Sequence, residues 1–301
     1  MMKKMRNKIR VFLSTAALGA ICAVAAYGCE GFDDYQQQVN KLRVLGVSAD
    51  SPDIMVKFIG SIPVFDPPLA TLGAVIGDPL GDGREVSLYW AACPPMTMDM
   101  TGAFNCDGNN GMPISPDSPV FDPMAYINWL IARGGFDPEA FRNIDPGSDG
   151  GSIPILIWLR ASAGSESVVS LKRINFILGN EPNHNPVLTG VNVAGNPLTP
   201  ETVIRSGVSY PFTPLVDPDS IETYTDPVTG KQLREQPVVS WYSSEGLFNY
   251  LLTGEKSPSN TFKAPVLAED ESSRPVTFWF VLLDQRGGSD WIAAVEATIT
   301  K

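Results

Sequence analysis

The sequence predicts an all-β protein built from two tandem immunoglobulin-like β-sandwich domains, the first carrying a short helical, disulfide-bearing insert. Three observations predict this class. The 301 residues include 27 Gly and 26 Pro, so turns are frequent. Short runs of alternating apolar and polar residues, typical of strands, lie between those turns. The order of strand patterns in one half of the chain also recurs in the other half.

The recurring order is a first strand, a Trp-bearing strand and a closing hairpin that also bears Trp. The matched segments are 44–52 with 188–197, 87–94 with 238–245, and 155–177 with 277–299. The two Trp strands lie 68 residues apart in the first half, from Trp90 to Trp158, and 38 apart in the second, from Trp241 to Trp279. The surplus predicts an insert in the first half. We expect these four Trp side chains to lie in sandwich cores.

The insert spans about 94–150. Cys93 and Cys106 close a 14-residue segment, and in an exported chain they are expected to form a disulfide. Asp122 is a good N-cap, Pro123 suits the first helical position, and two Gly end the run. These signals predict a helix over 121–133, with a polar loop following to residue 151.

The second half begins after EPNHNP (181–186), whose two prolines predict a short, stiff linker. The expected first domain is 41–180 and the second is 187–301. A tandem pair on such a linker is expected to hold a restricted mutual angle.

The start of the chain has the pattern of a secretory signal. Residues 1–10 contain five basic residues and no acid, and the following run to Ala26 is almost wholly apolar. This run is short for a membrane span, which needs about 20 residues. Removing the signal leaves 17 basic and 33 acidic residues, a net charge of −16. Such a surface argues against nucleic acid as a partner, because binding phosphate needs basic patches.

The residues up to Cys29 resemble a bacterial lipoprotein signal, with Gly28 as the small residue before the acylated Cys. The resemblance implies cleavage after residue 28 and lipidation of Cys29. The polar residues that follow predict a tether over 29–40. Glu30 implies delivery to the outer membrane, facing the periplasm or the surface. Cysteine parity agrees, because pairing of Cys93 with Cys106 leaves Cys29 as the odd thiol. Soluble export and an uncleaved anchor are the alternatives.

The mature pattern, including LRVLGVSADSP (42–52) and FVLLDQRGG (280–288), is also similar to myxobacterial lipoproteins with paired Ig-like domains. That family offers no established activity to carry over.

No catalytic constellation stands out, so we expect a non-enzyme without cofactors. The sole histidine, His184, lies in the linker and is expected to be solvated. No cluster of Cys and His suggests zinc. Acidic loops leave calcium open, although such residues more often form turns. The relevant residues are Asp107, Asn109, Asn110, Asp145, Asp149, Asp217 and Asp219.

The leading functional hypothesis is a membrane-anchored scaffold that binds an envelope protein. A possible interaction patch is Tyr126, Trp129 and Phe136 on the insert, unless the helix simply packs on its own domain. The hairpin over 223–232 could also project as a contact. The alternative is a glycan-binding or glycan-cleaving surface lipoprotein, which would need a row of exposed aromatic side chains.

Overall fold

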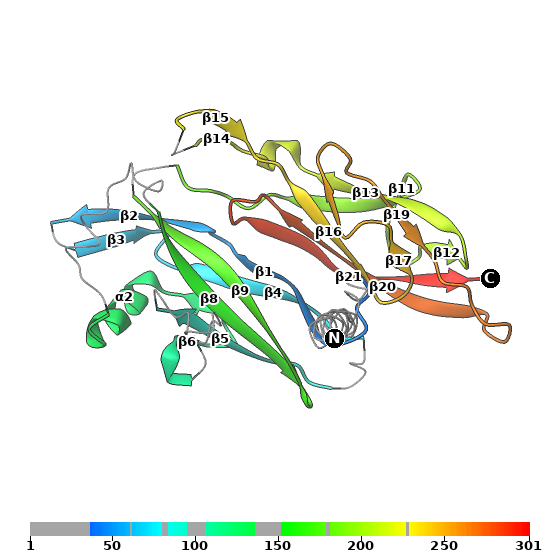
Figure 1. The fold of residues 1–301 in the computed structure, drawn as a ribbon, viewed down its shortest axis with the longest axis horizontal. Helices are drawn as coiled ribbons and strands as arrows, with labels where there is room; N and C mark the ends of the chain where they lie inside the picture. The colour runs from blue at the N-terminus through cyan, green and yellow to red at the C-terminus, as the bar shows by residue number, and fades with distance from the viewer. Residues whose placement is uncertain are drawn as a thin grey trace, which may run out of the picture. The chain divides into compact units, whose positions relative to one another are not determined.

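A computed structural model of the chain describes residues 37–60, 62–79, 84–94, 106, 108–135, 152–178, 181–226 and 229–301. Residues 37–301 form one compact unit. Two β-sandwiches with separate apolar cores make up this unit (Figure 1), so the predicted fold class is confirmed.

The first sandwich packs a three-stranded sheet on a six-stranded sheet, and all strands come from the first half of the chain. The smaller sheet has the order β1 (Arg43–Ala49), β4 (Ala70–Gly77), β7 (Val120–Phe121). The larger has the order β3 (Ile62–Asp66), β2 (Asp53–Ile59), β9 (Glu166–Ile177), β8 (Ser152–Ala163), β5 (Ser87–Cys93), β6 (Met112–Ile114).

The second sandwich packs two five-stranded sheets. One has the order β11 (Asn196–Pro197), β10 (Leu188–Val193), β13 (Ser209–Val216), β19 (Asn260–Lys263), β17 (Leu247–Phe248). The other has the order β12 (Val203–Arg205), β21 (Ser289–Thr300), β20 (Ser273–Leu283), β16 (Val238–Ser243), β18 (Leu252–Gly254). In chain order these sheets match the A-B-E-D and C-F-G arrangement of immunoglobulin domains.

Strand pairing bears out the repeat seen in the sequence. The Trp strand pairs antiparallel with the hairpin's first strand in both halves, β5 with β8 and β16 with β20. The hairpin's second strand also has a parallel neighbour in both, β2 beside β9 and β12 beside β21. Trp90 lies opposite Leu159, and Trp241 lies opposite Phe280. Trp158 and Trp279 therefore occupy equivalent positions in the two halves, because each immediately precedes the residue that lies opposite the Trp of the neighbouring strand.

The two long hairpins form where the sequence predicts them. Strands β8 and β9 are in register over 12 pairs, from Ser152 opposite Ile177 to Ala163 opposite Glu166. Gly164 forms the turn with a positive φ of 57°, a conformation that costs glycine little. Alternation then directs apolar side chains of both strands into the core.

The insert contains the predicted helix, α2 (Pro123–Ala132). The Asp122 carboxylate accepts a hydrogen bond of 2.9 Å from the Ala125 amide, and Gly134 at a φ of 66° follows the helix. Its buried residues join the core of the first sandwich, which fixes the helix on its own domain. Among the described residues, short 3₁₀ turns also occur at η1 (Gly108–Asn110) and η3 (Pro218–Ser220).

The predicted hairpin after the linker forms a two-stranded arm, β14 (Thr223–Thr225) with β15 (Gln232–Arg234). The arm belongs to neither five-stranded sheet, and Figure 1 shows it beside the second sandwich. Its strand residues are exposed or half-buried.

Candidate functional site at the junction of the two sandwiches

An apolar contact joins the outer faces of two sheets. Its buried members from the first sandwich are Leu45 on β1 and Val75 on β4, and those from the second are Trp279 and Val281 on β20. Along each strand these side chains alternate with residues that fill the sandwich core. One face of the strand therefore packs in its own sandwich, and the other face packs against the neighbouring sandwich. Tyr242, Trp291 and the buried Val39 complete this contact.

Two glycines allow the sheets to approach this closely. A Cβ atom on Gly46 would lie 3.1 Å from Cγ1 of Val281, and one on Gly73 would lie 3.1 Å from Cη2 of Trp291. Both distances are shorter than ordinary van der Waals contact, so the side chain of Val281 or Trp291 would have to shift by a few tenths of an ångström to admit a methyl group. Glycine is therefore favoured at these two positions by close packing and not by its backbone angles.

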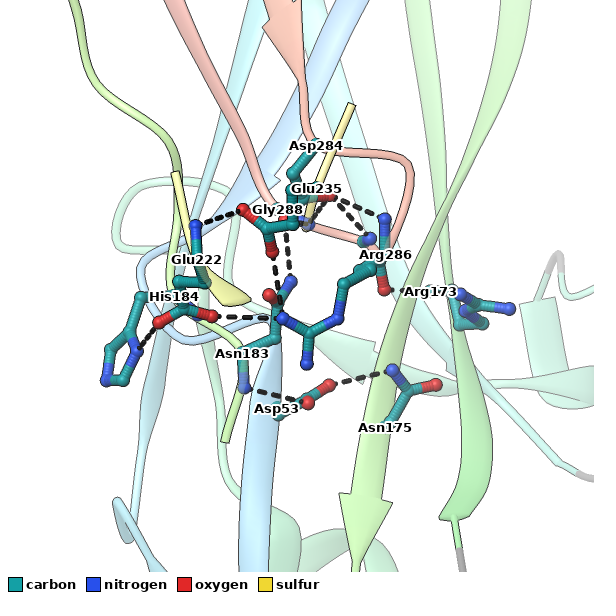
Figure 2. Close-up of polar contacts among 11 residues, drawn as sticks. Asp53, Arg173, Asn175, Asn183, His184, Glu222, Glu235, Asp284, Arg286 and Gly288 are labelled. Atoms are coloured by element: carbon teal, nitrogen blue, oxygen red, sulfur yellow. Dashed lines mark hydrogen bonds and ion pairs between the residues drawn. The ribbon is translucent and has the colours of Figure 1, made fainter. Parts of the chain in front are cut away.

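A polar network continues the junction at the linker (Figure 2). The Asn183 amide donates to Asp53 Oδ2 at 3.0 Å, and its Nδ2 donates to Asp284 Oδ2 at 2.6 Å. Asp53 lies at the start of β2 and also accepts from Asn175 Nδ2 at 2.7 Å, whereas Asp284 follows β20. Asn183 thus connects one carboxylate of each sandwich. Burial raises the pKa of Asp53, against the lowering effect of these hydrogen bonds.

A second linker amide makes the same kind of bridge. Asn185 donates through Nδ2 to the Ala49 carbonyl at 2.7 Å and accepts from the Ser289 amide at 2.9 Å. Asp290 accepts from the Leu188 amide at 2.7 Å, where the second sandwich begins. The linker is therefore fixed by side-chain hydrogen bonds as well as by its prolines.

The turn between β20 and β21 presents its backbone to the first sandwich. Asp284 Oδ1 accepts from the amides of Arg286 at 2.7 Å and of Gly287 and Gly288 at 2.9 Å each. Because the turn amides point inward to the Asp284 carboxylate, carbonyl groups of the turn point outward, toward the first sandwich. Lys172 Nζ donates to the Gly287 carbonyl and to Ser289 Oγ at 3.2 Å, although the residue is only 7% exposed. Burial lowers the pKa of Lys172 to about 8.

Arg286 fastens the β14–β15 arm to this turn. Its Nη1 donates to Glu222 at 3.0 Å and to Glu235 at 2.8 Å, and its guanidinium carbon lies 4.1 Å from the Tyr224 ring centre. The Glu235 side chain is fully buried, and burial raises its pKa. His184, expected to be solvated, is exposed and contacts Glu222 through Nδ1 (Figure 2). The charged groups of this cluster are thus paired with one another.

The beginning of the described chain also crosses the junction. The Val39 amide donates to the Ser243 carbonyl at 2.8 Å, and the Ser243 amide donates to the Gln37 carbonyl at 3.0 Å. Residues 37–39, at the end of the predicted tether, are thus paired with β16 of the second sandwich before the chain enters β1. The remainder of the tether lies outside the described residues.

The predicted site residues are dispersed. Cys93 and Cys106 form the expected disulfide, whereas Cys29 and Phe136 lie outside the described residues. Tyr126 is fully buried, and its hydroxyl donates to the Cys93 carbonyl at 2.6 Å. Its proposed place in an exposed patch is therefore wrong, because the residue faces the core side of α2. Trp129 is half-buried and stacks against Arg133, 4.1 Å from the ring centre.

All four predicted Trp residues are buried, but only Trp90 and Trp241 fill sandwich cores. Trp158 lies on the outer face of its sheet in a small cluster with Cys93 and Cys106. Trp279, at the equivalent position, lies under the first sandwich. The expectation of four core tryptophans is thus wrong for two of them, because alternation turns neighbouring strand positions to opposite faces.

The acidic loops left open for calcium are described only in part. Asp217 accepts from the Asp219 amide at 3.0 Å and caps η3, which is turn formation. Within the described ranges, no group of three His, Cys, Asp or Glu side chains is placed to hold a metal ion. Asp107, Asp145 and Asp149 fall outside those ranges.

Sequence reasoning missed the junction because its partners are far apart along the chain. Asn183 contacts residues 130 and 101 positions away. Two signals pointed toward it, the Asn residues within a proline-bounded linker and the glycines within alternating strands.

No protein-family profile and no curated protein sequence matches the chain. Solved structures with similar architecture include mouse cadherin-23 EC22–24, at 12% identity over 85% of this chain, with a TM-score of 0.21. The chimeric titin Z1Z2–Z1Z2 tandem matches at 10% identity over 86% of this chain and 100% of its own, with a TM-score of 0.21. The D0–D1 domain of intimin matches at 7% identity over 84% of this chain and 98% of its own, with a TM-score of 0.21. The alignment spans 64% of the cadherin-23 fragment.

At these TM-scores the similarities carry no functional information. No helix within the described ranges is long and apolar enough to cross a membrane.

Proposed function

We propose that the protein is a non-enzymatic, lipid-anchored scaffold of a bacterial envelope, whose two immunoglobulin-like sandwiches form one fixed platform for binding another protein. The observation that carries this proposal is the built junction. Glycine-mediated sheet contact, two bridging asparagines and a buried lysine fix the sandwiches against each other. Catalysis does not require such a junction, whereas presenting binding surfaces at a fixed spacing does.

The anchor part of the proposal rests on the lipobox-like residues up to Cys29 and on cysteine parity. Pairing of Cys93 with Cys106 accounts for two of the three cysteines that remain after the signal. Delivery to the outer membrane, facing the periplasm or the surface, follows from Glu30 by the same resemblance. From Cys29 to Gln37 the chain reaches at most about 30 Å, so the junction stays near the membrane.

Metabolic labelling with palmitate tests the anchor. We expect Cys29→Ser to abolish labelling, because the acylated sulfur is removed. Cys22→Ser, which changes the other cysteine of the signal, should label like the wild type. Label retained on Cys29→Ser would contradict lipidation at that residue.

Cross-linking in intact cells tests the scaffold. We expect discrete adducts with a small set of envelope proteins, and deletion of residues 96–145 should remove those that depend on the insert. An unchanged set would exclude the insert as the binding surface but leave the scaffold intact. Absence of any reproducible adduct would contradict protein binding altogether.

The glycan-binding alternative is not favoured by the aromatic residues. Trp90, Trp158, Trp241 and Trp279 are each at most 5% exposed, so they offer no flat row for stacking on sugars.

A further inference from the structure

Residues 37–41, which we call the strap, join the second sandwich before the chain enters the first. Gln38 and Ser243 form a parallel bridge, so the strap adds a short strand to the edge of β16. β18 pairs with β16 over Val238–Ser240 only, which leaves this part of the edge to the strap. Gln38 Nε2 also donates to the Ser244 carbonyl at 3.3 Å. The strap is therefore attached to the second sandwich, although it precedes the first in sequence.

Val39 is the one residue of the strap that is buried, and it reaches the apolar contact between the sandwiches. Gly77 on β4 gives it room, because a Cβ atom there would lie 2.6 Å from Cγ1 of Val39. The strap is thus held by one buried side chain and by hydrogen bonds to Ser243 and Ser244. Such a small set of contacts opens locally while the rest of a fold stays closed.

Exposed residues separate the docked part of the strap from the first sandwich. Asn40 and Lys41 are both exposed, whereas Leu42 is buried. The Leu42 amide donates to Glu166 Oε2 at 3.2 Å, and Arg84 Nη2 donates to the same oxygen at 2.8 Å. The chain is thus fixed in the first sandwich from Leu42 onward. Rotation at Asn40 and Lys41 is enough to free the strap without disturbing β1.

We propose that the strap is a releasable coupling between the membrane tether and the two sandwiches. While docked, it makes the tether leave the protein beside the edge of β16. When the tether is pulled, the strap detaches, and residues 37–41 extend the reach of the tether by at most about 18 Å. The apolar sheet contact and the linker asparagines keep the sandwiches together during this change. The membrane attachment rests on the proposed lipid anchor, whereas the strap itself does not.

Amide hydrogen exchange in the chain from Cys29 onward, made without its first 28 residues, measures opening of the strap. The Val39 and Ser243 amides both bond across it, so we expect them to share one protection factor. That factor should lie about tenfold or more below those of the Asn183 and Ser289 amides, which belong to the junction. Equal protection of all four amides would overturn the proposal, because the strap would then open only with the junction.

A glycine variant displaces the strap without changing any of its residues. In Gly77→Ala the added methyl group would overlap Val39, so the strap should leave β16. We expect the Val39 and Ser243 amides to lose protection by about tenfold or more. Gly254→Ala is the matched control, because Gly254 pairs with the same strand and its Cβ would meet nothing closer than 3.9 Å. This control should exchange like the wild type.

Spin labels separate release of the strap from opening of the junction. In a Cys29→Ser background, labels at Asn40→Cys and Val266→Cys report on the strap, and labels at Val169→Cys and Val266→Cys report on the two sandwiches. Gly77→Ala should broaden the first distance distribution and leave the second narrow. Val39→Asp, which would bury a charge if the strap stayed docked, should do the same and covers a folding failure of Gly77→Ala. A narrow first distribution in both variants, or a broad second one, would overturn the proposal.

A pulling experiment tests release under load. With handles on Cys29 and Val169→Cys, the chain should show a reversible extension of at most about 18 Å at forces below those that unfold the sandwiches. Gly77→Ala should lack this step, and its absence from the wild type would contradict release by tension. None of these measurements needs the lipid. Failed palmitate labelling would therefore refute the anchor alone, whereas failure of the exchange and label experiments would refute the strap alone.

Discussion

Lys172 is a buried cation at the junction, and its burial has a cost that depends on pH. The ammonium loses most of its hydration and regains hydrogen bonds to Gly287 and Ser289. Its pKa falls from 10.5 to about 8 in the folded protein. Between these values the unfolded chain binds more protons at this site than the folded chain does. Raising the pH through that window therefore favours the folded state.

We predict that the free energy of unfolding contains a contribution from Lys172 that rises from pH 8 to 10.5, by at most about 3 kcal/mol. Lys172→Met should lack this rise, whereas Lys256→Met, an exposed control, should retain it. Urea unfolding at a series of pH values measures the difference. Parallel profiles for the wild type and Lys172→Met would show that the amine titrates as in the unfolded chain.

At the scale of strands, the same sheet face is used differently in the two halves. In the first sandwich, the Cys93–Cys106 disulfide region covers the outer face of the sheet that contains β8 and β9. In the second sandwich, the corresponding face belongs to the sheet that contains β20 and β21, and the first sandwich covers it. The face that docks in the first sandwich carries Leu45 and Val75. At the matching positions of the second sandwich stand Thr189 and Leu215, and both are exposed.

Gly46 and Gly190 provide a matched test of the sheet contact, because both sit at the register shift of a first strand. Gly46→Ala should destabilise the protein by about 1–3 kcal/mol, since its Cβ would press on Val281. Gly190→Ala should cost less than about 0.5 kcal/mol, because its Cβ would meet Leu215 at an ordinary 3.4 Å. Denaturant unfolding measures both. Equal effects would contradict a tight contact at Gly46.

These elements also show what sequence could predict. The hairpins, the helix after Asp122 and the Trp strands follow from local alternation and capping, which a sequence displays directly. Local alternation does not predict which outer sheet face is covered by the other sandwich. The sequence around Leu45 would show the same pattern whether that side chain were exposed or buried in the contact. The partners of Asp53 and Asp284 could not be predicted either, since no local signal links positions 101 or 130 residues apart.

At the scale of the whole chain from Gln37 onward, three kinds of contact act together at the junction. The apolar sheet contact excludes water, the linker asparagines satisfy buried polar groups on both sides, and residues 37–39 pair with β16. Loss of any one leaves the other two, so we expect the two sandwiches to keep one arrangement rather than to swing about the linker. Surfaces on the two sandwiches would then be held at a fixed spacing.

The distance between spin labels on the two sandwiches tests this central claim most directly. Val169 and Val266 are exposed, at 53% and 79%, and each can be changed to Cys and labelled without reducing the native disulfide. Pulsed electron double resonance on the double-labelled protein should give a single narrow distance distribution. The same distribution should remain after cutting the tether before residue 37. A broad or multiple distribution in the intact protein would contradict a fixed platform.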